Sequence, residues 1–370
     1  MKINYLDNYL DCWFKKKYLA TLTWVLILPK YKLLYVPIPK AACTKLRTLL
    51  ILLKRGYEDK ELEKFLNTTL APFYNWEFGI SDNHRLGYQK LYELFYNSDY
   101  FKFAFVRNPY ERLESMYAYR IGFPQLFLDA SQTTKDYYLY MQRQAVYFAQ
   151  QIKAEINWHS SKFVKTFFSQ IDSTINSIFS NQIGTSILLR DQYMKKFPLQ
   201  ESETYDYKVI EQRISESFKK AYTNKNYPDN FSLRLYEKIK RTLGYSDIET
   251  IDLEKNPISF EEFINFVCNQ NPKCMDVHWQ PQTLQLSWDF IKYDFIGHME
   301  NFEQDIRYVF KRINAPEYIY NFVKEKQNSS QKQGKGIFWT DELAEKVYIK
   351  YKADFEAFGY NKMSYKKNIR

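Results

Sequence analysis

The first part of the chain alternates between short apolar runs and a stretch with helical spacing. Two runs rich in β-branched and aromatic residues, Leu19 to Leu28 and Tyr31 to Ile38, are separated by a Pro-Lys pair and predict two paired strands. The second run has few polar positions, which is typical of a strand buried on both faces. From Thr44 the period becomes helical until Gly56, with apolar positions at Leu46, Leu49, Leu50 and Leu53. This spacing predicts a helix that ends at the glycine.

A second transition from strand to helix follows. Phe101 to Val106 is a short apolar run that predicts another strand. Asn108 then suits the N-cap of a helix, Pro109 its first position, and Glu111 completes a pair that resembles a capping box. Because strands feed helices in this order, the sequence predicts an α/β fold with a central parallel sheet flanked by helices.

Residues 120–250 have a different character. Segments such as Tyr137 to Phe148 and Ser161 to Phe179 are polar, aromatic and helically spaced. We expect a large, mostly helical insertion at one edge of the α/β core. On this interpretation residues 1–370 form a single domain that contains the insertion at 120–250.

Composition narrows the class of protein. Hydrophobic residues make up 45% of the chain and aromatic residues 19%, which excludes a largely disordered chain. The formal net charge of +10 fits an anionic ligand, nucleic acid or a membrane surface without choosing among them. Four cysteines are too few and too scattered for a disulfide framework or a CxxC zinc site.

Targeting features are weak. The apolar run from Leu19 to Pro29 is about eleven residues long, whereas a transmembrane helix needs about 20. Lys30 and Lys32 follow it, where a signal peptide would have a small-residue cleavage site. We therefore expect a cytoplasmic protein with no transmembrane segment. Peripheral membrane contact and the oligomeric state stay open.

The first predicted turn has features of an anion site. Val36 to Leu46 is predicted as a strand, a tight turn and a helix start, and backbone N–H groups at a helix N-terminus bind anions. Lys40 adds a positive charge and Thr44 adds a hydroxyl. The segment lacks the GxxxxGK[ST] pattern of a Walker A loop. An ordinary strand-to-helix loop with a solvated lysine is the alternative.

The second transition has comparable features. Arg107 lies where the strand ends and the capped helix begins, and Ser115 follows eight residues later, about two helical turns. An arginine at a helix start can bind a phosphate with bidentate, charge-assisted hydrogen bonds, and the helix dipole supports the interaction.

Together the two elements resemble the nucleotide-binding signatures of sulfotransferases that use 3′-phosphoadenosine 5′-phosphosulfate (PAPS). Pro39 to Thr44 resembles the 5′-phosphosulfate loop, and Arg107 with Ser115 resembles the 3′-phosphate site. The PKxACT sequence of the loop is closest to that of carbohydrate sulfotransferases of the HNK-1 and chondroitin 4-O type. The resemblance implies that PAPS contacts eight residues: Lys40, Ala41, Ala42, Cys43, Thr44, Lys45, Arg107 and Ser115.

Two further stretches extend this resemblance. Phe260 to Glu300 resembles the "FxxF…HWxPQ…YDxIGxxE" region of the subfamily, and Tyr351 to Tyr360 resembles its closing "YxxDFExFGY". The likeness covers about residues 31–120 and 255–360. It implies the P-loop-like, three-layer sulfotransferase fold.

The chain also departs from the secretory members of this subfamily. Its insertion is longer, an N-terminal anchor is missing from the sequence, and Leu286 and Asp289 stand in place of a paired-cysteine motif. These differences suggest an intracellular, prokaryotic enzyme. They leave the acceptor open.

A histidine is the expected general base, because its reference pKa of ~6.5 lies near the operating pH. His84 lies between the two phosphate elements and precedes Arg107 by 23 residues, and the catalytic histidine of PAPS-dependent sulfotransferases falls in a similar place. We predict His84 as the base and Lys40 as the second catalytic residue. His278, in "HWxPQ", is the alternative base. No HxxxH, HExxH or carboxylate cluster suggests a metal.

The resulting hypothesis is in-line transfer of a sulfuryl group from PAPS to a hydroxyl group of a carbohydrate or other acceptor. A P-loop-type kinase or phosphotransferase is the first alternative, although it would need Mg²⁺ and a Walker-type loop. A non-catalytic polyanion-binding protein is the second, and only the net charge supports it. No specific nucleic-acid partner is expected.

Overall fold

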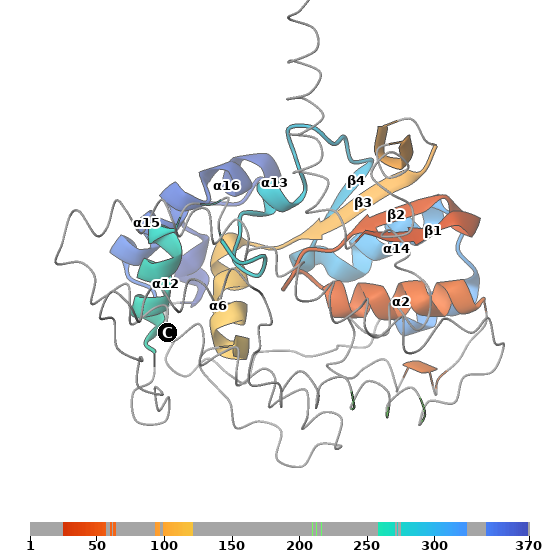
Figure 1. Ribbon diagram of the computed structural model, residues 1–370, viewed down its shortest axis with the longest axis horizontal. Helices are drawn as coiled ribbons and strands as arrows, with labels where there is room; N and C mark the ends of the chain where they lie inside the picture. Colours follow the sequence, from red (N-terminus) through yellow and green to blue (C-terminus); the bar gives the residue numbers. More distant parts are fainter. Residues whose placement is uncertain are drawn as a thin grey trace, which may run out of the picture. The chain divides into compact units, whose positions relative to one another are not determined.

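The computed structural model describes residues 25–56, 60, 62–63, 93–96, 99–120, 209, 212, 216, 258–270, 272, 275–323 and 338–368 (Figure 1). These residues belong to two compact units. The described parts of Met1–Asn108, Pro281–Gln327 and Ala353–Tyr360 form the first unit. Those of Pro109–Gln280, Asn328–Lys352 and Asn361–Arg370 form the second.

A four-stranded sheet organises the first unit. Its strands are β1 (Leu26–Leu28), β2 (Leu33–Val36), β3 (Phe101–Val106) and β4 (Phe295–His298), in that spatial order. β1 runs antiparallel to β2 across η1 (Pro29–Tyr31), whereas β2, β3 and β4 are parallel. This mostly parallel sheet confirms the predicted α/β class.

Helices cover both faces of the sheet. Because successive strand residues point to opposite faces, Leu34 and Ala104 pack on one side with Phe358 of α16 (Lys352–Phe358). On the other side Phe103 contacts Phe105, and Phe105 contacts α14 (Phe302–Arg312). Figure 1 shows α2 (Cys43–Arg55) and α14 below the sheet, and α13 (Gln282–Gln285) and α16 to the left of the strands, at about the height of β4. The described core is therefore a three-layer arrangement.

The two predicted helix starts are present. α2 follows β2 and ends at Gly56, whose φ of 88° is left-handed and whose N–H donates to the Leu52 carbonyl at 3.2 Å. α6 (Pro109–Arg120) follows β3 directly. The backbone N–H of Asn108 donates to Glu300 Oε1 at 2.8 Å, a partner 192 residues away. Both strand-to-helix junctions are thus confirmed, and a distant carboxylate supports the second.

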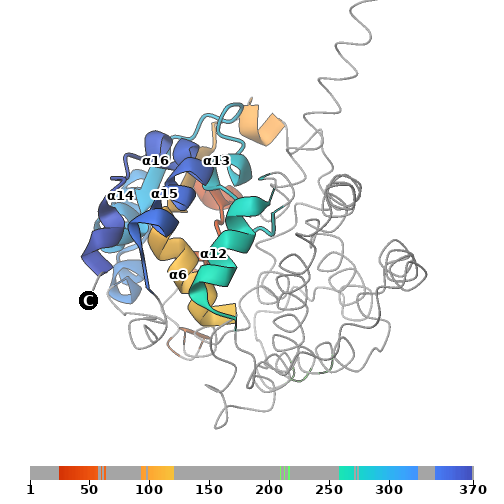
Figure 2. The same cartoon turned by 90° about the vertical axis from the view of Figure 1, so that its left-hand side faces the viewer.

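The second unit is helical, with an aromatic core. It contains α6, α12 (Phe260–Asn269), α15 (Asp341–Lys350) and η7 (Ser364–Asn368), and Figure 2 shows α6, α12 and α15 as neighbours. The capping box of Ser259 and Glu262 starts α12. Edge-on ring contacts join Tyr110 to Trp339, Trp339 to Phe260, and Phe260 to Tyr117.

Other described elements are short: η4 (Met299–Asn301) and η5 (Glu317–Phe322). The predicted helical insertion at 120–250 lies outside the described residues, apart from Arg120 and residues 209, 212 and 216. Within the described part of the chain, we find no helix that is both long and apolar enough to cross a membrane.

Candidate functional site

The turn between β2 and α2 has an unusual backbone. Lys40 has a φ of 68° and Ala42 a φ of 58°, and both values are uncommon for residues other than glycine. Ala42 is the N-cap of α2, and its methyl group cannot accept a hydrogen bond from the helix. The first four N–H groups of a helix have no intrahelical partner. The turn therefore presents amide donors behind small side chains, as an anion-binding loop requires.

Arg107 lies beside this turn. Its Nη1 donates to the carbonyl oxygen of Lys40 at 3.4 Å, the long end of hydrogen-bonding distance. The two residues meet because β2 and β3 are adjacent and parallel, so that their carboxyl ends share one edge of the sheet. Ligands of α/β proteins bind at such an edge. The structure thus brings together Lys40 and Arg107, two residues from separate predicted elements.

Other residues of the predicted loop are partly or fully buried. The side chain of Lys45 is buried, and its Nζ lies 3.9 Å from Oε1 of the buried Glu63. The charge of Lys45 therefore lies against a carboxylate, and its contribution to anion binding would come through its backbone N–H. Ala41 is buried, and the Thr44 carbonyl accepts from Thr48 Oγ1 at 3.1 Å.

The remaining predicted residues lie elsewhere. Ser115 is a buried residue of α6, in the second unit. His84 lies outside the described residues, so its role as the base stays a prediction.

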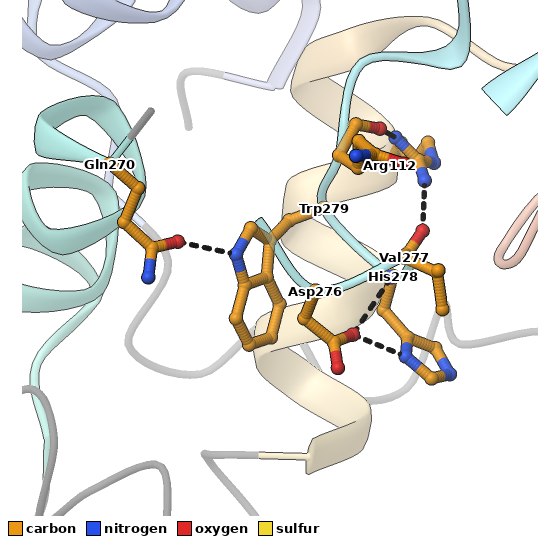
Figure 3. Close-up of polar contacts among 7 residues, drawn as sticks. Arg112, Gln270, Asp276, Val277, His278 and Trp279 are labelled. Carbon is orange, nitrogen blue, oxygen red and sulfur yellow. Dashed lines mark hydrogen bonds and ion pairs between the residues drawn. The ribbon is translucent and has the colours of Figure 1, made fainter. Parts of the chain in front are cut away.

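His278 is paired with a carboxylate. Asp276 Oδ1 lies 2.6 Å from His278 Nδ1 and also accepts the His278 backbone N–H at 2.9 Å (Figure 3). A carboxylate at Nδ1 favours the imidazole tautomer that has its acceptor at Nε2. The pair thus has the arrangement of a histidine oriented for proton transfer.

The loop that carries His278 is held by Arg112. Arg112 is only 1% exposed, and its guanidinium donates from Nη1 to the Gln280 carbonyl at 2.7 Å and from Nη2 to the Val277 carbonyl at 3.0 Å. Figure 3 shows Arg112 on α6 reaching the backbone of this loop. Because arginine stays charged in proteins, these are charge-assisted hydrogen bonds.

Trp279 belongs to the core of the second unit. It is 1% exposed, its ring contacts Phe263 and Phe266 edge-on, and its Nε1–H donates to Gln270 Oε1 at 2.8 Å. The tryptophan of the "HWxPQ" stretch is therefore a packing residue.

Comparison with known proteins identifies the family. The model of the sulfotransferase family matches residues 24–186 and 189–361, most of the chain. The chain belongs to the sulfotransferase family. This membership confirms the resemblance seen in the sequence, and the sheet with its flanking helices confirms the expected fold.

Curated relatives of this sulfotransferase-family chain are distant. Carbohydrate sulfotransferase 14 of Danio rerio is 26% identical over 151 residues, 38% of this chain and 40% of the relative. Carbohydrate sulfotransferase 11 of Rattus norvegicus is 25% identical over 162 residues, 42% of this chain and 46% of the relative. The chain thus spans less than half the length of these relatives. No solved structure matches it.

Four residues that the sequence analysis did not single out are now connected to the site residues. They are Arg112, Asp276, Gln282 and Asp354. Asp276 lies two positions before His278, and this spacing was the only local signal. The others are buried polar residues whose partners are distant in the sequence.

Proposed function

We propose that this member of the sulfotransferase family transfers the sulfuryl group of PAPS to a hydroxyl group of a carbohydrate. The observation that carries the proposal is the turn before α2. In this turn Lys40 and Ala42 have a left-handed backbone conformation, and the Arg107 guanidinium donates to the Lys40 carbonyl oxygen. The carbohydrate acceptor is suggested by the relatives, which are named carbohydrate sulfotransferases.

The residues of the turn fit the donor nucleotide. In our proposal the N–H groups of Ala42 to Lys45 bind the 5′-phosphosulfate, and the charge of Lys40 opposes it. Arg107 binds the 3′-phosphate, with Ser115 assigned to the same phosphate by the resemblance. One side-chain charge then opposes each anionic group, Lys40 the phosphosulfate and Arg107 the 3′-phosphate, so we expect no requirement for a divalent metal in binding.

The proposed chemistry needs one proton acceptor and one positive charge. PAPS supplies an activated sulfuryl group, whose bond to the bridging phosphate oxygen breaks as the acceptor oxygen bonds to sulfur. His84 takes the proton of the attacking hydroxyl. Lys40 stabilises the negative charge that develops on the bridging oxygen, and this interaction strengthens in the transition state.

His278 is the second candidate for the base. Its pairing with Asp276 is the observation that favours it, because a carboxylate that orients the imidazole also stabilises the imidazolium that forms.

Binding and turnover test the proposal separately. Adenosine 3′,5′-bisphosphate should raise the melting temperature of the protein by mass action on the folded state, and AMP should raise it much less. The protein should also transfer ³⁵S from labelled PAPS to one member of a glycan panel, in the presence of EDTA. Equal shifts with both nucleotides would contradict the role of Arg107. Turnover that EDTA abolishes and Mg²⁺ restores would favour a phosphotransferase, and salt-sensitive heparin binding with no nucleotide shift would favour a polyanion-binding protein.

A further inference from the structure

A buried glutamine binds the backbone of Arg107 on both sides. Gln282 Oε1 accepts the Arg107 N–H at 2.9 Å, and Gln282 Nε2 donates to the Arg107 carbonyl oxygen at 2.8 Å. The primary amide thus pairs with one residue as a neighbouring strand would, just beyond the end of β3. Gln282 is 0% exposed, so water does not compete for these two hydrogen bonds.

Gln282 is in turn held by a buried carboxylate. Asp354 Oδ2 accepts the Gln282 backbone N–H at 2.8 Å and lies 3.4 Å from its Nε2. Asp354 Oδ1 accepts the N–H of Thr283 at 2.9 Å and its Oγ1–H at 2.8 Å. Since Pro281, the N-cap of α13, has no side-chain acceptor, Asp354 caps this short helix from another part of the chain.

Burying these groups costs free energy unless each one is hydrogen-bonded, because a buried carboxylate and a buried amide both lose their hydration. Asp354 is 0% exposed, yet it accepts from three close donors. The contacts continue in one direction, from Asp354 through Gln282 to the Arg107 backbone. The Arg107 side chain continues the series to the Lys40 carbonyl.

We infer that Gln282 and Asp354 are positioning residues for the donor nucleotide. By fixing the peptide groups on both sides of the Arg107 Cα, they set the direction of its guanidinium toward the 3′-phosphate. Asp354 acts through Gln282, and neither contacts the nucleotide. The inference rests on the proposed role of Arg107 as the 3′-phosphate ligand.

The experiment compares affinities for two nucleotides that differ only in the 3′-phosphate. Isothermal titration calorimetry gives the dissociation constants of AMP and of adenosine 3′,5′-bisphosphate. The ratio of the AMP constant to the bisphosphate constant measures the contribution of the 3′-phosphate. Gln282→Met keeps the length of the side chain and removes both hydrogen bonds. It should lower the ratio by about tenfold or more, since small misplacements of a ligand-binding group have effects of this order, while AMP affinity stays within about twofold.

The matched control is Gln285→Met, at another buried glutamine of the same helix, and it should leave the ratio unchanged. Asp354→Asn is a second variant in case Gln282→Met does not fold. It retains the size of the side chain and an acceptor, and should lower the ratio less than Gln282→Met does.

The outcomes separate the inference from the proposed function. A wild-type ratio near one would overturn the role of Arg107 itself. A wild-type ratio well above one, unchanged in both variants, would overturn only the positioning role. Loss of AMP and bisphosphate affinity by equal factors would show that the two residues merely stabilise the fold, which also overturns it.

Discussion

Replacing Arg112 should destabilise the protein far more than replacing an exposed arginine. Arg112→Met keeps the apolar stem and removes two charge-assisted hydrogen bonds to the carbonyls of Gln280 and Val277. Each such bond contributes about 1.5–3 kcal/mol, and the loss is partly offset because the variant no longer buries a charge. We therefore expect the free energy of unfolding to fall by about 2–4 kcal/mol.

Urea denaturation followed by circular dichroism measures this change, provided that the m-value stays constant. The control is Arg307→Met. Arg307 lies partly exposed on α14, in an i,i+4 pair with Glu303 and 5.6 Å from the centre of the Tyr320 ring. Such a pair contributes about 0.3–0.5 kcal/mol, and such a ring contact about 0.5–1 kcal/mol. If Arg112→Met cost no more than Arg307→Met, the guanidinium would not be what holds the loop of His278.

Three further predictions concern the base, the sheet and the half-buried thiol of Cys268. His84→Ala should lower kcat by ~10²- to 10⁴-fold and keep near-wild-type affinity for adenosine 3′,5′-bisphosphate. If His84→Ala retained turnover while His278→Ala were inactive, His278 would be the base. Gly297→Ala should destabilise the protein by about 1–3 kcal/mol through overpacking and so lower its melting temperature, because the new Cβ would lie 2.6 Å from Phe105 Cζ; an unchanged melting temperature would refute this. Burial raises the pKa of Cys268 from 9.0 to about 12, so its thiol should resist iodoacetamide at pH 9 until the protein unfolds. The stability that the protonated thiol contributes should be lost as pH rises from 9 toward 12. Rapid modification of folded protein, read by mass spectrometry, would contradict that prediction.

The elements that the sequence predicted well are those with local signals. α2 has a regular apolar period and a terminal glycine, and β3 was predicted with the bounds that it has, Phe101–Val106. β1 and β2 are shorter than the apolar runs that indicated them. β4 was not predicted as a strand, because Phe295–His298 is only four residues long and contains a glycine. What makes it a strand is pairing with β3, nearly 200 positions earlier in the chain.

The candidate site shows the same division. Lys40 and Arg107 were recognisable because each follows a strand that ends at a helix start. Gln282 and Asp354 lie in the stretches that resemble the family, but no role could be assigned to them, since a buried glutamine and a buried aspartate have no periodicity, and their hydrogen bond joins residues 72 positions apart. Sequence patterns therefore identified groups at the ends of elements, and missed those that hold them from a distance.

The C-terminal stretches that resemble the family can now be divided by what their residues do. In "HWxPQ", Trp279 packs against α12, and the Tyr351 hydroxyl donates to its carbonyl. Gln282, which closes the same stretch, binds the Arg107 backbone, and Asp354 of "YxxDFExFGY" holds Gln282. Trp279 and Tyr351 are framework, whereas Gln282 and Asp354 position a proposed ligand, so packing and hydrogen bonding account for all four without any role in bond making. His278 is the exception, because packing does not require an imidazole paired with a buried carboxylate. In our proposal the base is His84 or His278, and kcat of the two alanine variants, measured at saturating donor, tests the two roles.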